Sequence, residues 1–382
     1  MIYLNNATTS FPKPESVIEA VNRYNQRPPM EASRFAAADD RPDLILECRK
    51  NLSRLFKVSD PENIIFTSGA THSLNLALLG LLRPGDHVVT TRIEHNSVLR
   101  VLKTLEKDRE ITLSIVPCDS LGHVSPADIR SCLKKDTRAV VVNHCSNVTG
   151  RVQDIKTIGR MVRDHPAVFI VDGAQSAGAI DINMEDLAAD VFVFTGHKSL
   201  FGMQGTGGLY MSREVCPEPL IIGGTGVKSD YLYQPRERPF RYEAGTPNTP
   251  GIVSLNAGVS FLLKCGIESV RKKKNALKQT ALDSFLDNPA VTVYGGTCLD
   301  DFSGHEAVIG FNLKDIPPDE AGYILTRSFG IICRSGLHCA PLIHEAIGTG
   351  PAGCLRVSFS YFNTEQEVEG LIHAVDEITA VL

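Results

Sequence analysis

The sequence lacks the features that mark several protein classes. No apolar run approaches the ~20 residues of a membrane-spanning helix, and MIYLNNATTSFPKP has no basic stretch leading into an apolar core. None of the ten cysteines forms a CxxC pair, so we predict no metal site and reduced thiols. The net charge of -5 provides no basic field for nucleic acid or an anionic membrane. These absences predict a cytoplasmic protein with small-molecule partners.

The chain has the size and balance of an ordinary globular protein. Its 382 residues are 43% hydrophobic and 22% charged, which suffices for two domains. Between about residues 62 and 212, apolar runs alternate with helical stretches. The runs lie near residues 64, 87, 111, 138, 167 and 190. Continuous apolar strands separated by helices predict a mainly parallel sheet covered on both faces, in a doubly wound α/β domain.

The pattern changes after the turn-rich segment RYEAGTPNTPG. Two long helices are followed by short strands and a closing helix, which predicts a smaller α+β domain that the first residues of the chain join. The strands are expected near residues 291, 307, 331 and 355, and the apolar stripe of the closing helix contains Val368, Leu371, Ile372, Val375, Ile378 and Leu382. The run Arg271 to Lys274 is interpreted as the solvated face of a helix.

The segment VFVFTGHKSLFG places a lysine directly after a buried strand. Its apolar residues run into the sequence TGHK at 195 to 198. An ammonium group is costly to desolvate, whereas a Schiff base with an aldehyde removes that cost and puts the amine to use. A surface lysine just past a strand end is the alternative. We predict that Lys198 holds an aldehyde cofactor.

A carboxylate follows a neighbouring apolar run. Asp172 ends the strand in AVFIVDGAQSAGAIDI. A carboxylate there can hold a protonated pyridine nitrogen and keep a cofactor ring an electron sink, whereas the alternative is an aspartate that caps the next turn. Because ligands bind at the carboxyl ends of strands in open α/β sheets, Asp172 and Lys198 together predict a pyridoxal phosphate site.

The segment FTSGATHSLNLALLGLL supplies a candidate phosphate seat. The strand ending at Thr67 turns through residues 68 to 71 into an apolar helix. Free backbone N–H groups, hydroxyls and the helix dipole favour an anion at such a turn. An ordinary helix cap is the alternative, and the phosphate interpretation depends on the other two sites.

Four motifs connect the chain with a known enzyme group: TGHKSLFG, VDGAQSAG, YEAGTPNTPG and RSGLHCAP. Through them it resembles the class V aminotransferase group of pyridoxal-phosphate enzymes of fold type I, and within it the SufS-like cysteine desulfurases and selenocysteine lyases. The resemblance extends from LNNATTSFP to CLRVSFSYFNTEQEV. It implies a large domain at residues 15–255 with a mainly parallel seven-stranded sheet. Residues 1–14 and 256–382 would form the smaller α+β domain.

The resemblance also assigns residues to the cofactor. It implies that Lys198 forms the Schiff base, that Asp172 faces the pyridine nitrogen and that Gln175 lies near the ring hydroxyl. His95 would stack on the ring face, and Asn147 would lie near the ring and the substrate. The implied phosphate-binding residues are Ala70, Thr71, Thr195, His197 and Thr246, the last from a second subunit. A homodimer with shared active sites follows from that implication.

Two arginines complete the substrate site that the resemblance implies. Arg356 would bind the α-carboxylate of L-cysteine or L-selenocysteine through its planar pair of donors, which lysine cannot reproduce. Arg334, in RSGLHCAP, is similar to an arginine that the family places near the reactive loop. A surface ion pair is the alternative for either residue.

Cys339 distinguishes sulfur transfer from aminotransfer, decarboxylation and β-elimination. Moving a sulfur atom requires a nucleophile that accepts it, whereas the other reactions need no protein thiol. Cys339 follows His338 in a loop that contains Gly336 and Pro341, and we expect a flexible, exposed thiol, partly thiolate beside arginine or imidazolium. A free cysteine packed under a loop is the alternative. SufS-like members commonly carry a methionine between the alanine and the proline of this motif, so we expect a shorter or differently shaped loop.

These observations predict a PLP-dependent cysteine desulfurase that converts L-cysteine to L-alanine and receives the sulfur on Cys339 as a persulfide, with a protein as sulfur acceptor. The predicted catalytic residues are Lys198, Cys339 and His95. A selenocysteine lyase and another class V reaction, such as aminotransfer or epimerisation, are the alternatives. A dinucleotide-binding protein is excluded, because no GxGxxG follows the first strand and no Walker lysine is present.

Overall fold

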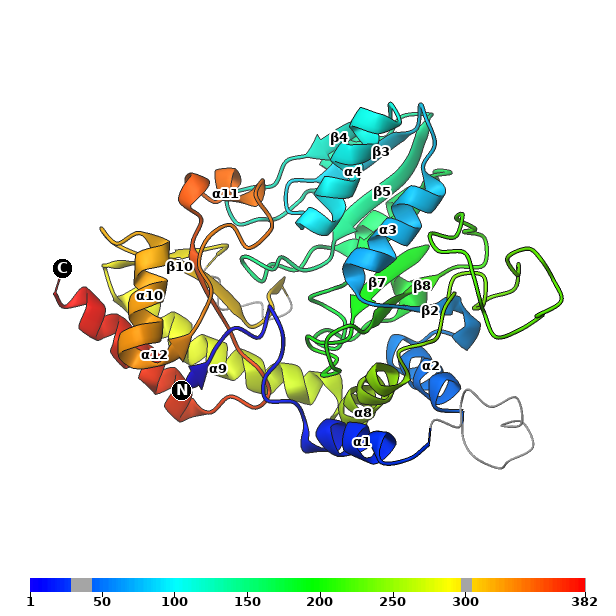
Figure 1. Cartoon of the computed structure of the whole chain (residues 1–382). Helices are drawn as coiled ribbons and strands as arrows, with labels where there is room; N and C mark the ends of the chain where they lie inside the picture. Colours follow the sequence, from blue (N-terminus) through cyan, green and yellow to red (C-terminus); the bar gives the residue numbers. More distant parts are fainter. Residues whose placement is uncertain (29–42, 297–303, 382) are drawn as a thin grey trace.

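Strands and helices alternate through much of the chain in the computed structural model, which describes residues 1–28, 43–296 and 304–381 (Figure 1). The strands are β1 (Ile2–Tyr3), β2 (Ile64–Thr67), β3 (His87–Thr91), β4 (Thr112–Val116), β5 (Thr137–Asn143), β6 (Val168–Asp172), β7 (Val191–Thr195), β8 (Gly207–Met211), β9 (Val291–Tyr294), β10 (Val308–Leu313), β11 (Ile331–Ile332) and β12 (Leu355–Ser358). The α-helices are α1 (Glu15–Asn25), α2 (Leu44–Phe56), α3 (Ala70–Leu81), α4 (Asn96–Asp108), α5 (Pro126–Cys132), α6 (Ile155–Val162), α7 (Met184–Leu187), α8 (Thr249–Cys265), α9 (Ile267–Asp287), α10 (Pro318–Phe329), α11 (Ile343–Ala346) and α12 (Glu365–Thr379).

Seven strands form one sheet in the order β2-β8-β7-β6-β5-β3-β4. The neighbours from β7 to β4 are parallel, whereas β8 runs antiparallel between β7 and β2. The predicted fold class, α/β with a mainly parallel seven-stranded sheet, is confirmed. Its parallel strands all end at the same edge, which is where Asp172 and Lys198 lie along the chain.

Both faces of this sheet are covered, which explains the continuous apolar runs. In β5, Val140 and Val142 join the core cluster that includes residues of α2, α6 and α8. Ala139 and Val141 join the opposite cluster, which includes residues of α3 and α4. Because successive side chains of a strand point to opposite faces, a strand between two helical layers is apolar at every position. Figure 1 shows α3 and α4 together on one face.

The smaller sheets lie on the other side of the molecule, beside α9, α10 and α12 (Figure 1). Strands β9, β10 and β12 form an antiparallel sheet, and β1 pairs in parallel with β11. These four strands, β9 to β12, lie where the sequence predicted them. The apolar stripe of the closing helix falls in α12, except for Leu382, which lies outside the described residues. The N-terminal residues therefore join the C-terminal elements, while α8 crosses the predicted boundary at residue 255, which stays a prediction.

One interpretation of the charged run on α9 is wrong. Lys274 is 6% exposed, and its Nζ donates to Glu306 Oε2 at 2.6 Å. The predicted solvated face holds for Lys272 and Lys273, which are exposed. Lys274 is buried because the segment before β10 covers this side of α9 and supplies a carboxylate, which makes burial of the ammonium tolerable.

Within the described residues, no single helix is long and apolar enough to cross a membrane. Helices α8 and α9 reach that length and composition only as a pair, and the chain bends by 86° between them. Leu255, Val259 and Leu262 of α8 pack in the large core cluster. The apolar composition of α8 therefore reflects packing against the sheet.

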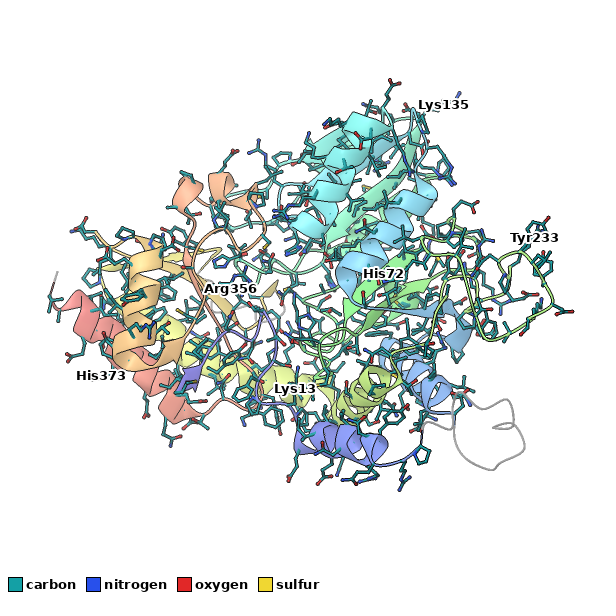
Figure 2. The ribbon with its side chains drawn as sticks, in the orientation of Figure 1. Lys13, His72, Lys135, Tyr233, Arg356 and His373 are labelled. Atoms are coloured by element: carbon teal, nitrogen blue, oxygen red, sulfur yellow. The ribbon has the colours of Figure 1, made fainter. Side chains whose placement is uncertain are left out.

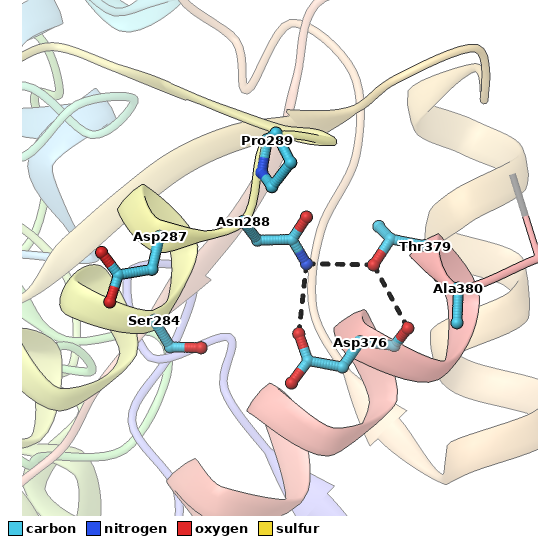
Figure 3. A pocket seen from close by; sticks show the side chains of 7 residues that line it. All are labelled: Ser284, Asp287, Asn288, Pro289, Asp376, Thr379 and Ala380. Carbon is cyan, nitrogen blue, oxygen red and sulfur yellow. Dashed lines mark hydrogen bonds between the residues drawn. The ribbon is translucent and has the colours of Figure 1, made fainter.

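A surface pocket lies between the ends of α9 and α12 (Figure 3). There, Asn288 Nδ2 donates to Asp376 Oδ1 at 3.1 Å and to Thr379 Oγ1 at 3.0 Å. None of the site residues predicted from the sequence lines this pocket.

A substitution at Gly207 tests the close approach of β8 to the start of α3. A Cβ there would lie 2.6 Å from Gly69 Cα and 2.8 Å from the Phe194 carbonyl oxygen, and neither backbone atom can move cheaply. We expect Gly207→Ala to lower the free energy of unfolding by about 2 kcal/mol, measured by urea denaturation. The control Gly224→Ala adds its Cβ in open space and is expected to be neutral. Equal loss in both variants would contradict the packing argument.

Candidate active site

Asp172 and Lys198 follow neighbouring parallel strands. Asp172 ends β6 and pairs in register with Val193 of β7, and Lys198 lies in the turn that follows β7. Asp172 is only 1% exposed, and its Oδ1 accepts a hydrogen bond from Ala174 N at 2.9 Å. The fold thus brings the two predicted groups to the same edge of the sheet.

Burial governs the ionisation of both groups. It raises the pKa of Asp172, although the Ala174 N–H and the Lys198 cation act against the shift. Burial also lowers the pKa of Lys198 to about 8; Asp172 opposes this shift, while Arg356 and Arg334 add to it. Burial therefore makes the neutral amine, which is the reactive form towards an aldehyde, easier to reach than in an exposed lysine. The buried carboxylate would gain from a further cation.

The turn between β2 and α3 leaves hydrogen-bond donors unpaired. The first N–H groups of a helix have no intrahelical partner. The N-cap of α3 is Gly69, which has no side chain to accept hydrogen bonds from them. Thr195 Oγ1 would lie 3.6 Å from a Cβ on Gly69, and the buried His197 Nδ1 has no partner. Thr71 is exposed. The start of α3 and Thr195 thus lie close together, and the backbone of Ala70 and Thr71 offers donors suited to an anion. A contact of His197 with the same anion stays a prediction.

His95 is the N-cap of α4, and its Nδ1 accepts a hydrogen bond from Ser97 N at 3.0 Å. A nitrogen that accepts from a backbone amide carries no proton, so the neutral ring has its proton on Nε2. Burial lowers the pKa of His95 to about 4, and the Lys198 cation acts in the same direction. The imidazole is therefore uncharged at neutral pH and suited to stacking on an aromatic ring.

Arg356 lies near the centre of the molecule (Figure 2), 2% exposed. Its Nη1 donates to the Asn147 carbonyl oxygen at 2.8 Å, and its Nη2 donates to Asn5 Oδ1 at 3.0 Å and to Thr8 Oγ1 at 2.8 Å. A guanidinium has five N–H groups, so two remain: the second on Nη1 and the buried Nε–H, which has no partner. Asn147 Oδ1 is also buried without a partner. These unsatisfied groups mark a place for a polar ligand.

The loop that carries Cys339 is anchored on both sides. Asn147 Nδ2 donates to the His338 carbonyl oxygen at 2.7 Å, and Asn96 N donates to the Cys339 carbonyl oxygen at 2.7 Å. His338 and Cys339 both have positive φ, 50° and 58°. Arg334 Nη2 lies 3.7 Å from Cys339 Sγ. The expectation of an exposed thiol is therefore wrong: Cys339 is partly buried, in a turn that hydrogen bonds join to the loops of the large sheet. The expected flexibility of the loop stays a prediction.

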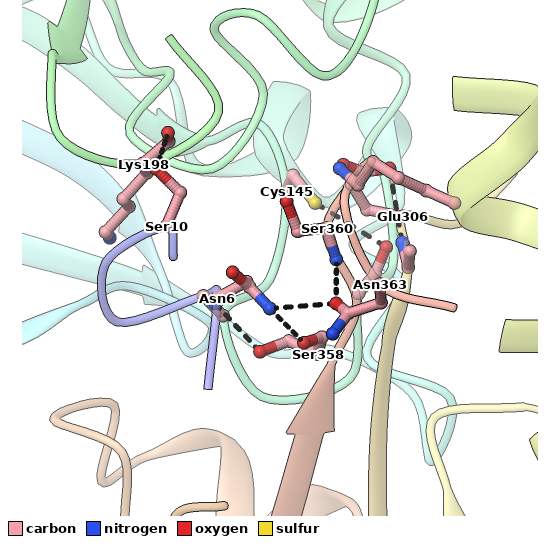
Figure 4. Close-up of polar contacts among 12 residues, drawn as sticks. Asn6, Ser10, Cys145, Lys198, Glu306, Ser358, Ser360 and Asn363 are labelled. Carbon is pink, nitrogen blue, oxygen red and sulfur yellow. Dashed lines mark hydrogen bonds and ion pairs between the residues drawn. The ribbon is translucent and has the colours of Figure 1, made fainter. Parts of the chain in front are cut away.

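An N-terminal segment, residues 5 to 13, contacts most of these residues. Gln175 Nε2 donates to the Ala7 carbonyl oxygen at 3.0 Å. Ser10 Oγ donates to the Lys198 carbonyl oxygen at 2.8 Å, as Figure 4 shows. Lys13 Nζ donates to the His197 carbonyl oxygen at 2.9 Å. These N-terminal contacts were not predicted. The small polar residues of LNNATTSFP are the feature of the sequence that indicates them.

Thr246 lies apart from this arrangement of hydrogen bonds. It is exposed, in the segment between β8 and α8. Its predicted contact with phosphate requires a second copy of the chain, and it stays a prediction. Cys145 is buried in the loop after β5, and Cys333 follows β11 and is partly buried.

The chain matches a known protein family along nearly its whole length. The model of the family "Aminotransferase class-V" matches residues 2–371. The chain belongs to the class-V aminotransferase family. This membership accounts for the resemblance that extends over nearly the whole chain.

Several known proteins are similar to this class-V aminotransferase family member. A "Probable cysteine desulfurase" of Pyrococcus abyssi (strain GE5 / Orsay) is 33% identical over 391 residues, which cover 100% of this chain and 95% of the relative. The apo structure of a cysteine desulfurase from Thermococcus onnurineus NA1 matches with a TM-score of 0.88 and 31% identity. The crystal structure of the cysteine desulfurase CsdA (S-sulfonic acid) from Escherichia coli matches with a TM-score of 0.87 and 26% identity. Each match covers 100% of this chain and 95% of the solved chain.

The reactivity of Lys198 towards acylation reports on its surroundings. In the cofactor-free protein, we expect acylation by an amine-reactive ester to increase with pH through an inflection near pH 8, because burial lowers the pKa of Lys198 to about 8. Asp172→Asn removes the charge that favours the ammonium form, so the inflection is expected below that of the unsubstituted protein. Peptide mass spectrometry at each pH measures the yield on Lys198. An inflection that rises in Asp172→Asn would contradict the coupling.

Proposed function

We propose that this chain is a pyridoxal-phosphate-dependent cysteine desulfurase, which converts L-cysteine to L-alanine and takes the sulfur onto Cys339. The observation that carries the proposal is the thiol of Cys339, held 3.7 Å from Arg334 Nη2 in a loop that Asn147 anchors. Relatives named as cysteine desulfurases, which match over the whole chain, support it.

The residues at the sheet edge fit pyridoxal phosphate. Burial raises the pKa of Asp172, so a protonated pyridine nitrogen beside it would supply the cation that the carboxylate lacks. The unpaired His197 Nδ1 and the uncapped start of α3 at Ala70 suit a phosphate. We assign Thr71 and Thr195 to the same phosphate. When bound, this cofactor stabilises the electron pair that remains after the substrate Cα loses its proton.

Lys198 has two roles in the proposed reaction. It holds the cofactor covalently before the substrate arrives, and its released amine then accepts the proton from Cα and returns it. An amine with a pKa of about 8 exists in both protonation states near neutral pH, which suits a group that must take up and give back a proton. His95 and Gln175 would keep the ring in place, His95 on its face and Gln175 beside its hydroxyl.

Arg356 would bind the substrate carboxylate. Its unpaired Nε–H and its remaining Nη1–H are two donors in a buried site, where charge-assisted hydrogen bonds are strong. Asn147 Oδ1, also unpaired, lies on the residue whose backbone oxygen accepts from Arg356. Substrate recognition would therefore occur next to the loop of Cys339, which Asn147 binds through its other amide atom.

Cys339 performs the sulfur transfer. Its thiolate attacks the sulfur of the bound cysteine; an S–S bond forms, and the Cβ–S bond breaks with its electron pair passing to Cβ. Protonation of that carbon completes L-alanine. Cysteine and the Cys339 thiol thus become alanine and a Cys339 persulfide, and the balance needs no added oxidant. A cytoplasmic protein acceptor would then remove the persulfide sulfur.

Two substitutions separate the cofactor step from the sulfur step. We expect Lys198→Ala to lose the visible absorbance of covalently held cofactor together with all activity. Cys339→Ala should keep that absorbance and lose alanine and sulfide formation from cysteine by about 100-fold or more, because the acceptor of the sulfur is missing. The control Cys216→Ala removes an exposed thiol and should leave turnover unchanged.

Three results would contradict the proposed reaction. Normal desulfuration of cysteine by Cys339→Ala would refute the persulfide step. An unsubstituted protein that is inert with L-cysteine but active with L-selenocysteine would identify a selenocysteine lyase. Amino-group transfer or racemisation without sulfide would identify another class V reaction. Alanine, sulfide and selenide are measured side by side with both substrates.

We also propose a homodimer with shared active sites. The segment between β8 and α8 exposes large apolar side chains: Ile222 is 72% exposed, Leu232 is 93% and Tyr233 is 76%. Figure 2 shows Tyr233 at the outer end of this segment. Such exposure is costly for an isolated chain. Thr246 belongs to the same segment and would reach the phosphate of a second copy, near the exposed Thr71.

A charge in this segment tests the dimer. We expect Leu232→Asp to shift the protein from dimer to monomer in sedimentation velocity at micromolar concentration, because association would bury the new carboxylate. Tyr323→Asp, at an exposed aromatic residue of α10, is the control and should remain dimeric. An unsubstituted protein that is monomeric and fully active would refute the shared site.

A further inference from the structure

The hydroxyl of Thr8 lies between the two arginines of the site. Arg356 Nη2 donates to Thr8 Oγ1 at 2.8 Å, and Arg334 Nη1 donates to the same oxygen at 3.3 Å. The oxygen has two lone pairs, so it accepts both bonds. One neutral atom therefore fixes the separation and the relative orientation of two guanidinium groups.

The two arginines lie close enough to influence each other. They occupy opposite positions of an antiparallel bridge, with N···O distances of 3.1 and 2.7 Å between their backbones. Burial lowers the pKa of Arg356 to about 10, and the charge of Arg334 adds to the shift. Arg334 is less buried than Arg356 and can turn its head group towards solvent. Without an acceptor between them, repulsion would favour that movement.

The hydroxyl proton of Thr8 has a fixed direction. Thr8 Oγ1 donates to Asn5 Oδ1 at 2.7 Å, and Asn5 Oδ1 also accepts from Arg356 Nη2 at 3.0 Å. Thr8 N donates to the Asn5 carbonyl oxygen at 3.0 Å, which closes the turn. Since the proton points to Asn5, the lone pairs of Thr8 Oγ1 face the arginines.

Arg334 reaches two groups at once. Its Nη1 is bound to Thr8, and its Nη2 lies 3.7 Å from Cys339 Sγ. Because the guanidinium is planar and rigid, the bond to Thr8 sets where the other nitrogen points. A guanidinium N–H this close to the sulfur can donate a charge-assisted hydrogen bond to it.

We propose that Thr8 is a positioning residue that divides the work of the two arginines, holding Arg334 on the sulfur of Cys339 and leaving the free N–H groups of Arg356 to the substrate carboxylate. The inference rests on the proposed function, which it deepens. Thr8 is assigned no direct contact with the substrate or the cofactor. Its effect passes through Arg334 to the rate at which Cys339 reacts.

Valine at position 8 keeps the shape of threonine and loses the hydroxyl. We expect alkylation of Cys339 by iodoacetamide in Thr8→Val to slow by about fivefold at fixed neutral pH, the effect of one hydrogen bond. Peptide mass spectrometry of the holoenzyme measures the rate. The kcat for alanine formation should fall in parallel, with the cofactor absorbance unchanged. Thr8→Ser should restore both rates, because it restores the acceptor.

Two further variants complete the experiment. Thr326→Val removes a threonine hydroxyl that donates to the Ile331 carbonyl oxygen at 3.1 Å, outside the site, and should alkylate at the unsubstituted rate. Asn5→Ala frees the Thr8 hydroxyl and should slow alkylation less than Thr8→Val does. It also tests the inference if Thr8→Val fails to fold.

Unchanged alkylation in both Thr8→Val and Asn5→Ala would overturn the inference, as would a Thr8→Ser variant as slow as Thr8→Val. Failure of the proposed function gives a different result. In that case the unsubstituted protein forms no alanine or sulfide from cysteine, whereas the alkylation difference between Thr8→Val and Thr8→Ser is still measurable.

Discussion

Asp172 and Lys198 follow adjacent parallel strands, and burial makes the charge of each costly. A cation beside the carboxylate would stabilise its charge, and loss of a proton from the amine would remove a buried charge. A heteroaromatic aldehyde with a basic ring nitrogen meets both needs, since it supplies a cation to one group and consumes the amine of the other. The parallel sheet imposes this proximity, because β6 and β7 are neighbours that end at the same edge. The other assigned roles are arranged around that pair.

The N-terminal segment connects this edge with the residues proposed to handle the substrate. Residues 5 to 13 bind the Lys198 turn through Ser10 and Lys13, and bind the arginines through Asn5 and Thr8. The segment follows β1, which pairs with β11 shortly before Arg334. Movement of the smaller sheets would therefore be transmitted to both the arginines and the lysine turn. Short side chains suit this role because they allow close backbone approach.

The sequence predicts the fold wherever a strand is buried on both faces. Strands apolar on both faces, such as β5, are recognised from their runs, and Asp172 and Lys198 stand out because charges rarely follow such runs. Strand β8 gave no such signal, since Gly207 and Gly208 begin it to admit close neighbours. The anchoring of Cys339 and the burial of Lys274 arise from segments distant in sequence, Asn96 and Glu306. Residue pattern alone carries no information about such partners.

The central claim is that one particular amine carries the cofactor beside a buried acid. Borohydride reduction of the pyridoxal-phosphate-loaded protein, followed by peptide mapping, locates the covalent link directly. We expect a single labelled peptide, with the label on Lys198. A label on another lysine, or no label in a protein that turns over cysteine, would contradict the claim.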